Sequence, residues 1–142
     1  MNYSVGVNTR GSGAVTRATN RLARFMGVHI LIVEDHPDTR VILLKLLVRC
    51  GHDVAAAETV KEALLLLDTF RFDVLVSDIG LPDGSGLELV VEAKRRQRLK
   101  QTVALTAFGT EDDRNRGLRA GYDYYLTKPL DFRRLQSVLA EV

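Results

Sequence analysis

The chain has 142 residues and a mass of 15.8 kDa, with 46% hydrophobic and 27% charged side chains. This is the balance of a globular protein with one ordinary domain and a short extension. No apolar run approaches the roughly 20 residues of a membrane-spanning helix, and the N-terminus has no apolar block of signal-peptide length. The single cysteine, Cys50, excludes an internal disulfide and suits a reducing compartment. We therefore expect a cytoplasmic protein.

The net charge of +2 is unevenly distributed along the chain. Residues 1–27 contain four arginines and no acid, whereas residues 28–142 carry 16 basic and 18 acidic side chains. We interpret 1–27 as a flexible basic leader or linker, in which 19–26 could form two turns of helix. A nucleic-acid-binding arm is the alternative, but four spaced arginines without interleaved aromatic side chains are weak evidence for one. We expect no direct binding of nucleic acid.

From residue 28 onward, the pattern alternates between strands and helices. Residues 28–33 form a nearly continuous apolar run, which is typical of a strand buried on both faces. Pro37 suits the first turn of a helix that Gly51 ends. A weaker strand over 53–57 then precedes a capping box at 59–62, which opens a helix that continues to residue 70.

The second half of the domain repeats this order. Further strands are predicted at 73–77, 102–106 and 122–126, and further helices at 86–96, 110–121 and 132–141. The helix at 110–121 is charged and interrupted by Gly117, so we expect it to be marginal. Short strands separated by helices pair in parallel with right-handed crossovers. The pattern therefore predicts an α/β domain over residues 28–142, with a doubly wound five-stranded parallel sheet between two helical layers.

The strand ends carry the residues that are suited to chemistry. The first strand runs into Glu34 and Asp35, the third into Asp78 and the fifth into Lys128, while the fourth ends on Thr106. Because the carboxyl ends of parallel strands share one edge of a sheet, these groups converge if the strands are neighbours. The second strand ends in alanines and contributes no polar group, which favours an edge position for it.

Three converging carboxylates repel each other unless a cation neutralises them. Oxygen ligands select a hard ion, and two carboxylates with waters suit Mg²⁺. The histidines at 29, 36 and 52 are scattered and lack the spacing of metal ligands. With the Lys128 ammonium and the Thr106 hydroxyl nearby, such a site is suited to placing a phosphoryl group on a carboxylate nucleophile.

The segment 28–142 resembles the receiver domain of two-component response regulators. Four motifs carry the resemblance, in order and at strand ends: Ile32–Asp35, Asp78–Gly86, Ala104–Ala107 and Leu126–Pro129. The resemblance implies a flavodoxin-like, CheY-like fold with strand order 2-1-3-4-5 and three layers. It also implies that a phosphoryl group is accepted from the phosphohistidine of a histidine kinase or phosphotransfer domain, with Mg²⁺, or alternatively Mn²⁺, as the ion.

The resemblance gives the acidic positions distinct roles. Asp78 would be the phosphoacceptor. Asp35 and Asp78 would ligate the ion together with the backbone carbonyl of Gly80. Glu34, where aspartate is commoner in the family, would act mainly through a bound water. Glycine at position 80 has no side chain to screen the phosphoryl group.

The remaining motif positions are implied to bind the phosphoryl group and to respond to it. The Thr106 hydroxyl, the Lys128 ammonium and the Ala107 backbone N–H would contact the phosphoryl oxygens. Tyr125 matches the switch aromatic, which turns inward when the Thr106 hydroxyl moves to the phosphate. The Lys128–Pro129 peptide bond matches one that is commonly cis in the family. Phosphorylation would switch the surface formed by the fourth strand, fourth helix and fifth strand. A candidate homodimer interface is formed by the fourth helix, fifth strand and fifth helix.

Two other classes of function are consistent with parts of this pattern. The chain could be a receiver-like docking module that is never phosphorylated, although the complete set of acidic, hydroxyl and ammonium groups argues against it. It could also be a small Mg²⁺-dependent phosphohydrolase, but glycine at position 80 leaves no general acid two residues after Asp78. We therefore expect a signalling domain and not a stand-alone enzyme, either as a single-domain regulator or as the receiver of a hybrid histidine kinase.

Overall fold

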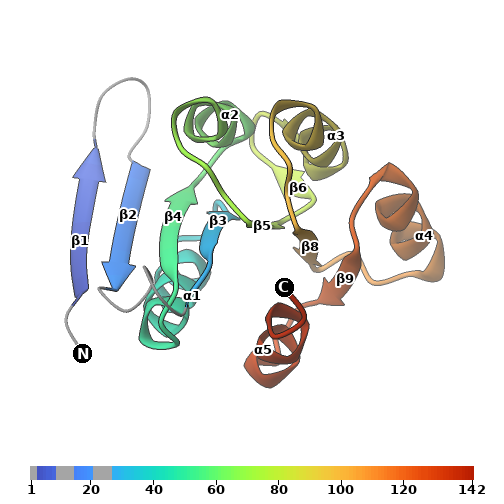
Figure 1. The fold of residues 1–142 in the computed structure, drawn as a ribbon. Coiled ribbons are helices and arrows are strands. Elements are labelled where there is room, and N and C mark those ends of the chain that lie inside the picture. Colours follow the sequence, from blue (N-terminus) through green and yellow to red (C-terminus); the bar gives the residue numbers. More distant parts are fainter. Residues whose placement is uncertain (1–2, 9–14, 21–26) are drawn as a thin grey trace.

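The computed structural model describes residues 3–8, 15–20 and 27–142, and its central element is a seven-stranded sheet. The spatial order of the strands is β1-β2-β4-β3-β5-β8-β9 (Figure 1). Their bounds are β1 Tyr3–Asn8, β2 Val15–Asn20, β3 His29–Val33, β4 Asp53–Ala57, β5 Val74–Ser77, β8 Gln101–Thr106 and β9 Tyr124–Thr127. A small antiparallel ribbon, β6 Gly80–Leu81 and β7 Gly84–Ser85, lies in the loop after β5.

The five strands from β4 to β9 in this order are parallel, as the sequence pattern predicts. Helices cover both faces of the sheet, with α1 and α5 on one side and α2, α3 and α4 on the other (Figure 1). Their bounds are α1 Pro37–Arg49, α2 Val60–Thr69, α3 Gly86–Arg96, α4 Glu111–Ala120 and α5 Phe132–Leu139. The doubly wound, three-layer architecture and the strand order expected for its five parallel strands are confirmed.

Two apolar clusters, one on each face, fix the layers. Neighbouring residues of β3 alternate between them, so that Ile30 and Ile32 pack with α1 and α5, whereas Leu31 and Val33 pack with α2 and α3. All four side chains are at most 1% exposed. This burial on both faces explains why the strand is apolar without polar alternation.

The outer edge of β4 differs from the expectation. The alanines that end this strand favour an edge position for it, whereas β2 pairs with it in antiparallel register, Thr16 opposite Ala56, and β1 pairs with β2. These strands lie within the segment that we expected to be a flexible leader. Of the residues 19–26, for which we expected helical turns, 19 and 20 belong to β2, and the others lie outside the described residues. Valine and threonine favour extended backbone, and an open strand edge offers unpaired N–H and C=O groups. The division of the chain at residue 27 stays a prediction.

The last parallel strand begins two residues later than expected. Tyr122 and Asp123 precede the strand and bind neighbouring elements through their side chains. The Tyr122 hydroxyl donates to the Gly86 carbonyl (2.7 Å), and the Asp123 carboxylate accepts from the Thr102 N–H (2.8 Å). The marginal packing expected of α4 agrees with its single buried residue, Gly117. Within the described residues, no helix has the length and apolar character needed to cross a bilayer.

Candidate functional site

The register of the sheet brings the predicted strand-end residues to one edge. Val33 of β3 lies opposite Ser77 of β5, so that Glu34 and Asp78 begin adjacent loops. The Asp78 N–H continues this ladder by donating to the Val33 carbonyl (2.9 Å). At the other side of the site, Thr106 ends β8, and the Lys128 N–H donates to the Thr106 carbonyl (2.8 Å).

The Lys128 ammonium joins two of the carboxylates. Its Nζ atom lies 2.9 Å from Glu34 Oε2, 3.1 Å from Glu34 Oε1 and 2.9 Å from Asp78 Oδ2. The Glu34 and Asp78 side chains are 2% and 8% exposed, respectively. One cation therefore compensates two almost buried anions, an arrangement in which the loss of the cation would be costly. The Lys128–Pro129 peptide bond is cis, as expected.

The ammonium keeps its charge over the whole neutral range. Burial acts against the charge of Lys128, but the hydrogen bonds and charges of Asp78 and Glu34 together outweigh it, so that the pKa is raised above its ordinary value of 10.5. A cation with a raised pKa stabilises the fold below its unfolded-state pKa, and that stabilisation is lost only as the pH rises through the higher folded-state value. The cation of this site is thus present at neutral pH.

Four potential metal ligands gather at the same edge. Single ligand atoms of Glu34, Asp35, His36 and Asp78 all lie within 4.8 Å of one another. Asp35 Oδ1 is shielded from solvent and accepts no hydrogen bond, although the His36 Nδ1 atom lies 3.3 Å away. An oxygen with unused lone pairs among carboxylates fits a hard divalent cation.

His36 is a member of this cluster that the sequence analysis sets aside. Its imidazole Nδ1 lies 2.9 Å from Glu34 Oε1, and its side chain is 69% exposed. The three histidines of the chain are scattered along the sequence and do not have the spacing of metal ligands relative to one another. That His36 directly follows the acidic pair is the signal that could have identified it.

The loop after Asp78 holds the remaining predicted ligand. The Gly80 N–H donates to Asp78 Oδ1 (3.2 Å), which keeps the loop folded back over the carboxylate. A Cβ atom at position 80 would lie 3.3 Å from Cε2 of Phe108, so the phenylalanine ring lies beside the glycine. The side chain that glycine lacks is therefore partly replaced in space by a residue from the loop after β8.

Phe108 also contacts both residues that are implied to act in switching. Its N–H donates to Thr106 Oγ1 (3.2 Å), and its carbonyl accepts a hydrogen bond from the Tyr125 hydroxyl. Thr106 is fully buried and Tyr125 is 7% exposed, so the tyrosine ring points inward, while Ala107 is exposed. Burial raises the pKa of Tyr125, which keeps its hydroxyl a donor. Sequence patterns gave no indication of Phe108.

The inward position of Tyr125 depends on a glycine of α4. A Cβ atom at position 117 would lie 2.6 Å from the Tyr125 Cδ2 atom, closer than two carbon atoms can approach. A hollow of about 180 Å³ remains beside the ring, bordered mainly by apolar side chains. Its lining residues are Ile79, Leu87, Phe108, Asp113, Arg116 and Tyr125. The glycine that weakens α4 as a helix thus makes room for the aromatic ring.

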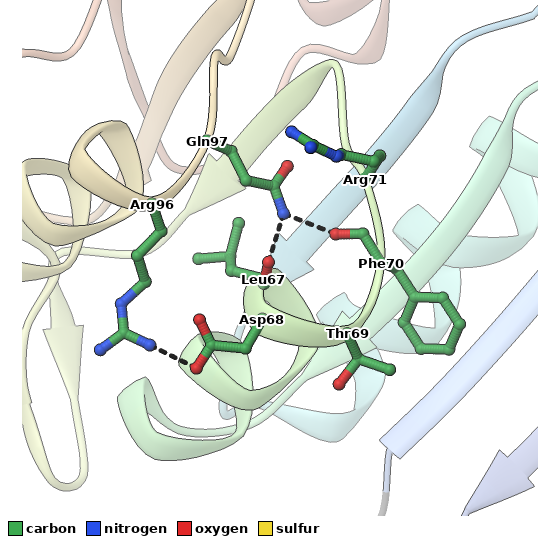
Figure 2. Close-up of a pocket in the computed structure, with 7 residues that line it drawn as sticks. All are labelled: Leu67, Asp68, Thr69, Phe70, Arg71, Arg96 and Gln97. Carbon is green, nitrogen blue, oxygen red and sulfur yellow. Dashed lines mark hydrogen bonds and ion pairs between the residues drawn. The ribbon is translucent and has the colours of Figure 1, made fainter.

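A second hollow, of about 210 Å³, lies where α2 and α3 end, near the start of β5 (Figure 2). The buried Gln97 amide occupies its wall: the nitrogen donates to the Leu67 and Phe70 carbonyls, and the oxygen accepts from the Phe72 N–H (2.9 Å). Arg96 pairs with Asp68 across the hollow (Figure 2). Because the Gln97 amide and the Arg96–Asp68 pair bond to groups of this junction, we interpret the hollow as a junction between helix ends.

The comparisons with known proteins agree with this geometry. The family model described as "Response regulator receiver domain" matches residues 30–140. The chain belongs to the response regulator receiver domain family. Over 110 residues it is 42% identical to the response regulator protein PilR of Pseudomonas aeruginosa, an alignment that covers 78% of this chain and 25% of PilR. This receiver domain thus spans only part of that relative.

Two further relatives extend the comparison. The receiver domain is 31% identical over 113 residues to the sensor protein EvgS of Escherichia coli O157:H7, covering 80% of this chain and 9% of EvgS. Among solved structures, a response regulator from Burkholderia pseudomallei, crystallised with a phosphorylated aspartic acid, a calcium ion and citrate, superimposes with a TM-score of 0.74 and 26% identity. That alignment covers 79% of this chain and 66% of the other.

Proposed function

We propose that this receiver domain is a phosphoacceptor switch in which Asp78 takes a phosphoryl group from the phosphohistidine of a histidine kinase or phosphotransfer domain. The observation that carries the proposal is the convergence of Asp78 with Glu34, Asp35 and the Lys128 ammonium at the carboxyl edge of the parallel sheet. The structural relative with a phosphorylated aspartic acid supports the same chemistry.

In the proposed transfer, a carboxylate oxygen of Asp78 attacks the phosphorus atom. The new O–P bond forms as the N–P bond to the donor histidine breaks, and the bonding electron pair leaves on the imidazole nitrogen. Lys128 stays within reach of Asp78 and balances charge on the phosphoryl oxygens. The Thr106 hydroxyl accepts from Phe108 in the present arrangement, so its own proton is free to be donated to the phosphoryl group. The exposed Ala107 N–H would add a further donor.

The acidic edge is suited to hold the ion that such a transfer needs. Asp35, Asp78 and the Gly80 carbonyl would ligate Mg²⁺, Glu34 would act through a bound water, and Mn²⁺ suits the same oxygen donors. The bound ion would supply positive charge next to the transferring group. The solvent-shielded Asp35 Oδ1, which accepts no hydrogen bond, is the observation in this chain that supports the assignment.

The first test is the intact mass of the full chain after incubation with acetyl phosphate and Mg²⁺. The wild type is expected to gain one phosphoryl group, and Asp78→Asn is expected to gain none, because an amide oxygen is a poor nucleophile and the acyl phosphate cannot form. BeF₃⁻ binding is measured in parallel, since a phosphoryl group that is lost quickly would escape the mass measurement.

The control distinguishes the proposal from its alternatives. A mass gain that persists in Asp78→Asn would assign the phosphoryl group to another residue. If the wild type showed neither phosphorylation nor BeF₃⁻ binding, the docking-module function would be favoured. Continuous release of phosphate from a phosphomonoester, which is not an activated phosphoryl donor, would favour the phosphohydrolase.

We further propose that phosphorylation acts on the surface formed by β8, α4 and β9. Phe108 is hydrogen-bonded to both Thr106 and Tyr125, so a movement of the threonine hydroxyl toward the phosphoryl group changes the contacts that hold the tyrosine. Only one residue of α4 is buried, which makes this helix the least anchored part of that surface. A ligand that prefers one arrangement of these elements would shift their populations.

Amide chemical shifts test this second proposal. Addition of BeF₃⁻ with Mg²⁺ is expected to perturb amides between residues 106 and 126 most strongly, apart from those of the loops that bind the ligand. A Tyr125→Phe variant, which lacks the hydroxyl, is expected to keep BeF₃⁻ binding while the response of α4 becomes smaller. A response limited to residues 1–27 would contradict the proposed switch. The candidate homodimer interface on α4, β9 and α5 and the origin in a hybrid kinase stay predictions.

A further inference from the structure

The junction of β4 and α2 (residues 58–62) contributes no predicted metal ligand, yet both acidic loops are attached to it. β4 ends in buried alanines, and Glu58, which follows it, pairs with Arg40 of α1. The contacts of this junction therefore bear on how the loops on either side keep their shape.

The first attachment runs through Arg40 of α1. Its guanidinium donates to the backbone carbonyls of Glu34 (3.1 Å) and Asp35 (3.3 Å), so it holds the main chain that carries both acids. The other end of the same guanidinium pairs with Glu58 Oε1 at 2.9 Å. The Arg40 side chain is 14% exposed and the Glu58 side chain 38%, so the bridge is half-buried and lies at the edge of the solvent.

The second attachment runs through Asp83, in the ribbon that follows the phosphoacceptor. Its two carboxylate oxygens accept from the N–H groups of Val60 (2.8 Å) and Lys61 (3.0 Å), the first two residues of α2. These donors have no partner within their own helix, and the positive end of the helix dipole favours an acid there. The loop that carries the Gly80 carbonyl is thereby attached to α2.

The junction itself is made rigid by its own hydrogen bonds. The Glu62 N–H donates to Thr59 Oγ1 (3.1 Å), as in a capping box, whereas the Glu62 carboxylate accepts from the N–H of Glu58 (2.9 Å), one residue before the N-cap. The two attachments therefore end on one fixed turn. A fixed turn that holds two ligand-bearing loops sets the distance between their carboxylates.

We propose that Arg40 and Asp83 are positioning residues of the metal site, because each attaches one carboxylate-bearing loop to the β4–α2 junction. This inference rests on the proposed function of the carboxylates as metal ligands. Neither side chain belongs to the cluster of potential ligands formed by Glu34, Asp35, His36 and Asp78. Outer partners of metal ligands commonly change metal affinity by roughly 10- to 100-fold when they are removed.

The test is the Mn²⁺ dissociation constant of the full chain, measured by titration calorimetry. Arg40→Gln and Asp83→Ala are each expected to raise it by about tenfold, while Asp83→Asn, which keeps an oxygen acceptor, restores most of the affinity. The matched control is Thr59→Ala. It removes one of the two hydrogen bonds of the turn but leaves the Glu58–Glu62 bond and both attachments in place, so the Mn²⁺ affinity is expected to fall much less than in Arg40→Gln or Asp83→Ala.

The outcomes separate this inference from the proposed function. Wild-type affinity in both Arg40→Gln and Asp83→Ala, or an equal loss in Thr59→Ala, would overturn the positioning role while the metal site itself stands. A wild type that binds no Mn²⁺ would overturn the proposed metal site, and the positioning role with it. Should Arg40→Gln not fold, Arg40→Lys and the exposed Asp83→Ala decide the question.

Discussion

Replacement of Lys128 by methionine is expected to lower the free energy of unfolding by about 3–5 kcal/mol in the absence of divalent ions. Methionine keeps most of the apolar stem but removes the ammonium that lies 2.9 Å from both Glu34 and Asp78. Two almost buried carboxylates then face each other without a counter-charge, and the loss of one partner of a buried pair costs more than the pair itself contributes. Urea denaturation measures the effect.

Addition of Mg²⁺ is expected to recover part of the lost stability, because a divalent cation among the carboxylates replaces the missing charge. The matched control is Lys100→Met. Its ammonium lies 3.5 Å from Asp73 and its side chain is 64% exposed, so its loss is expected to cost less than about 1 kcal/mol with or without Mg²⁺. Equal losses in the two variants would show that Lys128 acts as an ordinary surface cation.

Much of this site could be predicted from local sequence patterns. Continuous apolar runs identify the parallel strands, and their ends determine which polar residues share an edge. Glu34, Asp78 and Lys128 were placed together by this argument alone, and the register between β3 and β5 agrees with it. Such predictions succeed because strand periodicity and the direction of parallel strands are properties of the backbone and depend little on side-chain detail.

Contacts between distant side chains could not be predicted in the same way. The sequence around Asp83 indicates a turn, since proline and glycine flank it, but not that its carboxylate binds the first N–H groups of a helix more than 20 residues earlier. Phe108 likewise occupies the space beside Gly80 only because two loops meet there. Tertiary packing decides both contacts, and no periodic pattern encodes it.

The pairing of β2 with β4 could not be predicted from the sequence of β4 itself. The alanine-rich sequence of β4 was interpreted as a weak edge strand, and its own composition does not distinguish an exposed edge from one covered by a second segment. The information lies in residues 3–20, where short extended stretches are separated by glycine-rich sequence. The arginines of that segment indicate a solvated linker, whereas its extended stretches pair with the open edge of the sheet.

Replacement of Gly86 by alanine is expected to cost about 3 kcal/mol of folding free energy and to weaken Mn²⁺ binding at the same time. A Cβ atom at this first residue of α3 would lie 2.3 Å from the Asp78 carbonyl oxygen and 2.8 Å from the Ile79 Cα atom. Both are backbone atoms, so no side-chain rotation can relieve the clash, and overpacking of this kind costs at the upper end of the usual 1–3 kcal/mol.

The clash also explains why Gly86→Ala is expected to weaken Mn²⁺ binding. The strand end that carries Asp78 must move away from α3, and the Gly86 N–H, which donates to the Ile79 carbonyl at 2.7 Å, moves with it. The matched control is Gly84→Ala, whose added methyl group would meet only Val60 Cγ2 at 3.4 Å, an ordinary contact. That variant is expected to change the free energy of unfolding by less than about 1 kcal/mol and to bind Mn²⁺ normally. If Gly86→Ala lost stability but kept wild-type Mn²⁺ affinity, the position of Asp78 would be set by the sheet alone, and close packing against α3 would serve only the fold.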